Sequence, residues 1–193
     1  MIKKLFYLVL FIFLPIKVFA LIEIDITRGN LDPLPLAVSP LSIDDLSKKE
    51  FKNIVKIENI GSEISNIVEN NLRTSGLFNP LSKDAFLQAP DIANLKPRFE
   101  DWRLIKAQAL ITGKVSYINE KLRVEFRLWD VLAAKEMMAL AFTTVPSNWR
   151  IVGHIITDKI YERLTGEKGY FDTRIIYVAE EGPKTKRIKK LAI

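Results

Sequence analysis

Three consecutive segments with strand patterns, between residues 110 and 144, constrain the fold of this chain more than any other feature. The middle segment, residues 122–129, alternates apolar and charged residues, which predicts a strand with one buried and one solvated face. Residues 110–118 and 135–144 flank it and are separated from it by short turns. Because the strands follow one another directly, with helical patterns only before and after them, the sequence predicts an α+β fold with a mixed sheet.

Two amphipathic helices are predicted on either side of these strands. Apolar residues recur at helical intervals from Ile60 onwards, and Gly76 suits a left-handed cap at the end of this helix. The second helix is expected to begin after Asn148, a suitable N-cap, and to end at Gly166. We expect both helices to pack on one face of the sheet. Residues 33–40 add a short strand whose prolines belong at its ends or at a sheet edge.

The other segments of this region have weaker patterns. Residues 42–56 are polar and charged with weak helical spacing. Residues 82–98 contain Pro90 and Pro97 and are predicted to form a surface loop. A short helix is expected over residues 99–107.

The first twenty residues have the pattern of a secretory signal peptide. Two lysines precede an apolar run over residues 5–14, and small residues lie before the expected cleavage point between Ala20 and Leu21. The apolar run is shorter than the roughly 20 residues that span a bilayer, so a cleaved signal peptide is favoured over a retained anchor. We therefore expect an exported mature chain without a membrane span.

The expected mature chain opens with an extended segment in which apolar and acidic residues alternate. This period of two predicts an exposed or edge strand. Such a terminal segment can add a strand to the sheet edge of a partner protein, or it can complete the sheet of its own domain. The segment consists of Leu21, Ile22, Glu23, Ile24, Asp25 and Ile26.

The net charge of +6 does not describe the folded body of the chain. Basic residues concentrate in the expected signal peptide and in the last ten residues, and residues 21–183 hold 21 Lys and Arg against 23 Asp and Glu. A nucleic-acid partner requires a basic face on the folded body, so the sequence predicts no nucleic-acid binding. The chain has no cysteine, so its stability depends on packing and not on disulfides.

No catalytic or metal site can be assembled from these residues. His154 is the only histidine, whereas a zinc site needs three or four ligands and a general base needs a nucleophile beside it. The adjacent acid pairs Asp44-Asp45 and Glu180-Glu181 point apart, and the glycines do not form a phosphate-binding loop. We therefore predict no catalytic residues, no metal and no cofactor. The alternative, an exported enzyme or small-ligand binder, requires a pocket with converging polar groups.

Residues 173–193 have the pattern of a β-hairpin around Gly182-Pro183. A lone hairpin is marginally stable in water, and this one looks like the first half of a propeller blade whose remaining strands are not in the chain. Its apolar side chains, at Ile175, Tyr177, Ile188, Leu191 and Ile193, are expected to stay exposed. The basic residues from 184 to 190 could form a tail for membranes or nucleic acids, but the apolar residues among them favour a charged strand.

The passage from Trp149 to Val178 resembles the junction in the TolB family where an N-terminal α/β domain leads into a β-propeller. Residues 72–81 and 24–29 extend the resemblance. It implies a signal peptide over 1–20, an N-terminal α/β domain over 21–166, a linker over 167–172 and an incomplete first propeller blade over 173–193.

The resemblance also implies a function. Members of this family are non-enzymatic, periplasmic components of the Tol–Pal envelope system, which maintains outer-membrane integrity and supports constriction at cell division. They bind the inner-membrane protein TolA through the mature N-terminal segment, which corresponds here to residues 21–26. They bind the lipoprotein Pal through the propeller, most of which this chain lacks.

Overall fold

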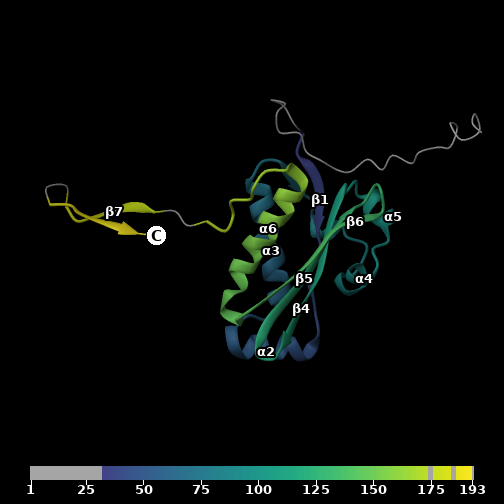
Figure 1. Ribbon diagram of the computed structural model, residues 1–193, viewed down its shortest axis with the longest axis horizontal. Helices are drawn as coiled ribbons and strands as arrows, with labels where there is room; N and C mark the ends of the chain where they lie inside the picture. Colours follow the sequence, from purple (N-terminus) through teal and green to yellow (C-terminus); the bar gives the residue numbers. More distant parts are fainter. Residues whose placement is uncertain (1–31, 174–175, 184–185, 193) are drawn as a thin grey trace, which may run out of the picture.

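The computed structural model describes residues 32–173, 176–183 and 186–192 (Figure 1). Within these residues, a six-stranded sheet carries helices on both faces, and a two-stranded hairpin follows it. The strands of the large sheet are β1 (Leu34–Val38), β2 (Ser42–Ile43), β3 (Phe78–Pro80), β4 (Ala109–Ile118), β5 (Lys121–Asp130) and β6 (Lys135–Thr144). The helices are α2 (Asp45–Val55), α3 (Ile60–Thr74), α4 (Pro90–Leu95), α5 (Phe99–Leu104) and α6 (Trp149–Thr165).

The large sheet is mixed, as the sequence predicts. Its strands lie in the order β3, β1, β4, β5, β6. β2 runs parallel to β4 and pairs with its residues Lys114 and Val115. β1 runs parallel to both of its neighbours, whereas β4, β5 and β6 form an antiparallel meander. The expected strands at 110–118, 122–129 and 135–144 are therefore confirmed, and the fold is α+β. Asn119 and Glu120 turn β4 into β5 with φ angles of 50° and 61°, the left-handed backbone of a tight two-residue hairpin.

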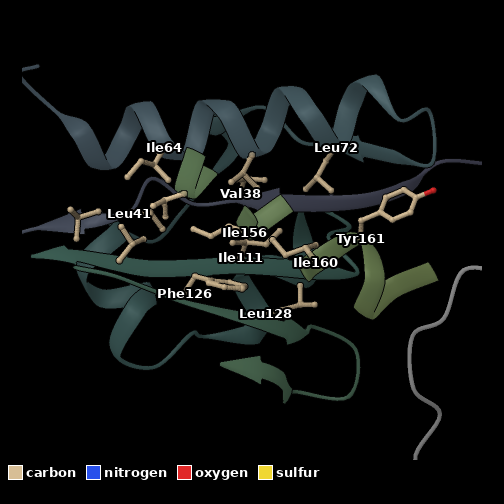
Figure 2. Close-up of a cluster of buried hydrophobic side chains, with 14 of the residues drawn as sticks. Val38, Leu41, Ile64, Leu72, Ile111, Phe126, Leu128, Ile156, Ile160 and Tyr161 are labelled. Carbon is tan, nitrogen blue, oxygen red and sulfur yellow. The ribbon is translucent and has the colours of Figure 1, made fainter. Parts of the chain in front are cut away.

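The two predicted long helices, α3 and α6, lie side by side on one face of the sheet (Figures 1 and 2). They approach closely at Gly153, where a Cβ atom would lie 2.9 Å from Cγ2 of Ile67. Figure 2 shows the apolar side chains that fill the space between these helices and the sheet. Most of these side chains are buried. Gly76 and Gly166, both with φ of +76°, follow the helix ends as expected.

The opposite face of the sheet carries a second, smaller core that the sequence did not predict. α4 and α5 cover this face, and α4 lies within residues 82–98, for which the sequence predicts a surface loop. Trp102, only 1% exposed, is the largest side chain of this core, and its ring packs edge-on against Phe86 with centroids 5.0 Å apart. The loop prediction failed here because six-residue helices are too short to show a period.

Residues 42–56 form β2 and the helix α2. Asp44 is its N-cap, and its carboxylate accepts hydrogen bonds from the backbone N–H of Ser47 at 2.9 Å and from the Ser47 hydroxyl at 3.0 Å. Of this helix only Ser47 and Phe51 are buried, which explains why its apolar spacing is weak. Phe51 packs edge-on against Tyr117 with ring centroids 5.4 Å apart, so α2 is fastened to β4.

The start of α6 differs from the expectation. Asn148 makes no side-chain capping bond, because the chain enters α6 from a short 3-10 turn over Pro146–Asn148. The Asn148 side chain instead donates to Thr144 Oγ1 at 3.3 Å. This contact ties the beginning of the helix to the end of β6.

The C-terminal hairpin consists of β7 (Tyr177–Glu181) and β8 (Ile188–Ala192), which pair antiparallel. Tyr177, Ile188 and Leu191 are 55%, 57% and 79% exposed, as expected, whereas Ile175 and Ile193 lie outside the described residues. Two of the basic residues of this segment, Lys189 and Lys190, lie in β8 and pair with the acidic residues of β7. The described residues contain no closed propeller.

Candidate functional site

The sequence-predicted partner-binding segment, from Leu21 to Ile26, and the cleavage position at Ala20 lie outside the described residues. The described chain begins at Asp32, and both Asp32 and Pro33 are exposed. β1 follows at once and is buried from Leu36 to Val38. The N-terminal segment is therefore connected to the domain at its surface, directly before a central strand.

His154 has a structural partner in the seam between the two long helices. Its Nδ1 atom lies 2.9 Å from Nδ2 of Asn71 on α3. The same Asn71 amide donates to Oγ1 of Thr157 at 3.1 Å. The contact with Asn71 therefore joins α6 to α3.

The adjacent acid pairs also have structural partners. The pKa of the Asp44 carboxyl is lowered, chiefly because it accepts the hydrogen bond from the Ser47 backbone N–H. The pKa of Glu180 is lowered by hydrogen bonds from Arg187 and Lys189 across the hairpin. Among the described residues, no group of three or more histidine or acidic side chains is arranged to hold a metal ion.

Two open hollows of about 530 and 510 Å³ are present on the surface of the described domain. The second lies between α3 and the loop after β3, and three of its charged residues, Glu69, Arg73 and Lys83, are ion-paired. Glu69 binds Lys83 at 2.9 Å and Arg73 at 2.5 Å. Burial opposes ionisation of Glu69 most strongly, but the two cations together outweigh it and lower the pKa of this carboxyl. These three side chains therefore form an ion-pair network in the wall of the hollow.

A clamp holds the segment after α6 against the helix. The carboxylate of Asp158 accepts hydrogen bonds from the backbone N–H groups of Phe171 at 2.7 Å and Asp172 at 3.2 Å. Gly169 passes so near that a Cβ atom would lie 2.4 Å from Cα of Asp158. The ring of Tyr161 adds edge-on contacts to the rings of Tyr170 and Phe171. Residues 169–172, within the expected linker, thus lie against α6.

The clamp leads to a testable prediction. Replacing Asp158 by Ala removes both acceptors, and each hydrogen bond to a charged group contributes about 1.5–3 kcal/mol. We expect the amides of Phe171 and Asp172 to exchange with solvent at least about ten-fold faster. Hydrogen exchange read by mass spectrometry or NMR measures this.

The matched control for the clamp is Glu162→Ala, which removes an exposed carboxylate one turn further along α6. It should leave the exchange of both amides unchanged. If Asp158→Ala also left them unchanged, the clamp would not hold this segment.

The two edges of the large sheet differ. β3 is three residues long and ends with Pro80, which has no N–H group to offer another strand. β6 is ten residues long and lies at the other end of the strand order, so in the described part of the chain no strand pairs with its outer side. A long open edge is a place where another strand can pair.

In the part of the chain that the structure describes, no helix combines the length and the apolar character that crossing a membrane requires.

Comparison with known proteins identifies the relatives of this domain. Residues 22–137 match the family model of the TolB amino-terminal domain. A Tol-Pal system protein TolB from Pelagibacter ubique (strain HTCC1062) is 82% identical over 185 residues, which are 96% of this chain and 42% of that protein. The crystal structure of TolB from Acinetobacter baumannii matches with a TM-score of 0.65 at 23% identity, over 86% of this chain and 37% of that one. The chain has the same fold and spans less than half the length of either relative.

Proposed function

The chain belongs to the TolB family of the Tol–Pal system, and from this we propose that it is a non-enzymatic, periplasmic docking protein. It acts by binding other proteins of that system. Residues 1–20 direct its export and are removed between Ala20 and Leu21. In this role it contributes to outer-membrane integrity and to envelope constriction at cell division.

The observation that supports a docking role is that several polar groups of the domain are bound to other groups of the same domain. His154 bonds Asn71 between two helices, and Asp44 caps a helix. Glu69, which lines the second hollow, is held by two cations. These groups serve the architecture of the domain, so its surfaces and its N-terminal segment are what remain to act on other molecules.

We assign the binding of a TolA-like inner-membrane protein to residues 21–26. An alternating, terminal segment joined to an exposed part of the domain can pair with the sheet edge of such a partner. Binding of a Pal-like lipoprotein belongs to a propeller, of which residues 173–193 are the first strands. The greater length of the relatives supports this division.

The test is a binding measurement with the C-terminal domain of TolA and the chain after signal removal. Deletion of residues 21–26 should weaken binding by at least about 100-fold, equivalent to about 2.7 kcal/mol, since the main-chain pairing would be lost. A variant with the same six residues in scrambled order, so that Ile22, Ile24 and Ile26 no longer share a face, should also lose binding. Calorimetry measures both.

Circular dichroism should show the same fold in all three proteins, because the deleted residues precede β1. Equal binding by the intact chain and the deletion variant would contradict the assignment to residues 21–26. The Tol–Pal membership of the family would stand in that case, and the binding surface would have to lie elsewhere.

A further inference from the structure

Tyr161, near the end of α6, contacts two parts of the chain that are far apart in sequence. Figure 2 shows it at one end of the apolar side chains between the helices and the sheet. Its ring packs edge-on against Phe78 of β3, with centroids 6.1 Å apart. It also packs edge-on against Tyr170 and Phe171, with centroids 5.5 and 5.7 Å apart. One buried side chain therefore joins the segment after α6 to a strand of the large sheet.

Residues 169–172, which we call the strap, are held on α6 by few groups. The carboxylate of Asp158 accepts two of their backbone N–H groups, and the rings of Tyr170 and Phe171 stack on each other with centroids 4.5 Å apart. Asp158 is only partly buried, and Tyr170 is 49% exposed. Partly exposed contacts open locally at a lower free energy than a buried core, so the strap can leave α6 while the domain stays folded.

β3, on the other side of this contact, depends strongly on the packing of Phe78. The strand has three residues, and Phe78 is 2% exposed. Two backbone hydrogen bonds join its ends to β1. The N–H of Leu34 donates to the carbonyl oxygen of Leu77 at 2.9 Å, and the N–H of Leu81 donates to that of Leu36 at 2.8 Å. So short a strand has few hydrogen bonds of its own, so its place beside β1 depends on its buried side chains.

We propose that the strap, Tyr161 and Phe78 form a latch, in which release of the strap from α6 loosens the pairing of β3 with the start of β1. When the strap leaves, Tyr161 loses its contacts with two rings and becomes exposed to solvent. Its ring is then free to move, and Phe78 loses a fixed neighbour. Closely packed interiors transmit such a displacement, because a vacated contact has no replacement.

The latch lies at the place where the chain enters the domain. Leu34 is the first residue of β1, it pairs with Phe78, and the exposed residues Asp32 and Pro33 precede it. The strap lies at the place where the chain leaves the domain, after α6. The latch therefore couples the entry and the exit of the chain. It is a property of the domain itself and holds whichever partner residues 21–26 bind.

The first test releases the strap and observes β1. In the chain after signal removal, Asp158→Ala should speed exchange of the Leu34 and Leu81 amides by at least about five-fold, the lower end of the usual coupling between sites. The Ser39 amide, bonded to Ile111 at 3.0 Å at the other end of β1, reports the general loss of stability and should change less. Glu162→Ala should leave all three amides unchanged. Hydrogen exchange followed by NMR measures them.

The second test asks whether Tyr161 transmits the change. Tyr161→Leu keeps an apolar side chain but removes the ring, so adding Asp158→Ala to it should change the Leu34 and Leu81 amides by less than about two-fold, as for independent sites. Tyr161→Phe keeps the ring and should preserve the full response. Circular dichroism establishes that each variant is folded. Unchanged exchange at Leu34 and Leu81 in Asp158→Ala, or the same acceleration in the Tyr161→Leu background, would overturn the latch.

The third test runs in the opposite direction, because a coupling free energy is reciprocal. Phe78→Leu should speed exchange of the Phe171 amide, at the strap, more than exchange of the Ser39 amide. The matched control is Phe126→Leu, at a phenylalanine of β5 that is 1% exposed and stacks on Phe142. It should speed the Phe171 amide no more than the Ser39 amide. Equal effects of the two substitutions on the Phe171 amide would also overturn the latch.

Discussion

Replacing Trp102 by Ala should lower the free energy of unfolding by about 3–5 kcal/mol, the usual cost of deleting a buried aromatic side chain. Trp102 is 1% exposed and is the largest member of the core between the sheet and α5. Its indole N–H donates to Oε1 of Gln88 at 2.7 Å, and the backbone N–H of Arg98 donates to the same oxygen at 2.9 Å. The substitution therefore creates a cavity and weakens the anchor of the preceding loop. Urea unfolding followed by circular dichroism measures the change.

Two variants make this experiment specific. Leu104→Ala changes a side chain on the same helix that is 75% exposed, and it should cost no more than about 0.5 kcal/mol. Trp102→Phe keeps a ring but removes the donor to buried Gln88, so its cost should fall in between, at about 1–3 kcal/mol. If Trp102→Ala cost as little as Leu104→Ala, the second face of the sheet would not carry a core.

Adding one methyl group at Gly113 should be nearly as damaging. A Cβ atom there would lie 2.2 Å from the carbonyl oxygen of Glu125 and 2.7 Å from Cδ2 of Leu41. The first contact is with backbone and cannot be relieved by a side-chain rotation. We expect Gly113→Ala to lower the free energy of unfolding by about 3 kcal/mol, the upper part of the range for overpacking. It should act by separating β4 from β5.

The control for Gly113 is Gly76→Ala, because a Cβ atom at Gly76 meets nothing within 4 Å. Gly76 has φ of +76°, so alanine there introduces only backbone strain, about 1–2 kcal/mol. Thermal unfolding of both variants separates the cost of a clash from the cost of strain. Equal losses in the two would show that close approach at Gly113 is not the reason for its glycine.

The sequence predicted the elements that have a clear period. The central strand of the meander, β5, alternates buried and partly buried residues, and α3 repeats its buried residues Ile64, Val68 and Leu72 at helical spacing. Periodicity is a local property, so one chain is enough to reveal it. Phe51 illustrates the limit, because α2 buries a single large side chain and its pattern was correspondingly weak.

The candidate sites were predicted less completely, for a related reason. The alternation of residues 21–26 is visible in the sequence, and their proposed binding role stays a prediction. The clamp between Asp158 and the N–H group of Phe171 joins residues 13 apart across a turn. Neither Asp158 nor Gly169 has a neighbour in sequence that indicates the contact. A glycine soon after the end of a helix was the one available signal.

The sequence by itself determined the α+β class, the three antiparallel strands and the helix pair, since these follow from the spacing of apolar residues. Only the tertiary structure decided that α4 and α5 cover the second face, that Gly113 lies against the backbone of β5, and that β6 is the last strand of the described sheet. Each of these depends on which distant segments come into contact. Such contacts are set by the packing of the whole core, which no short window of residues contains.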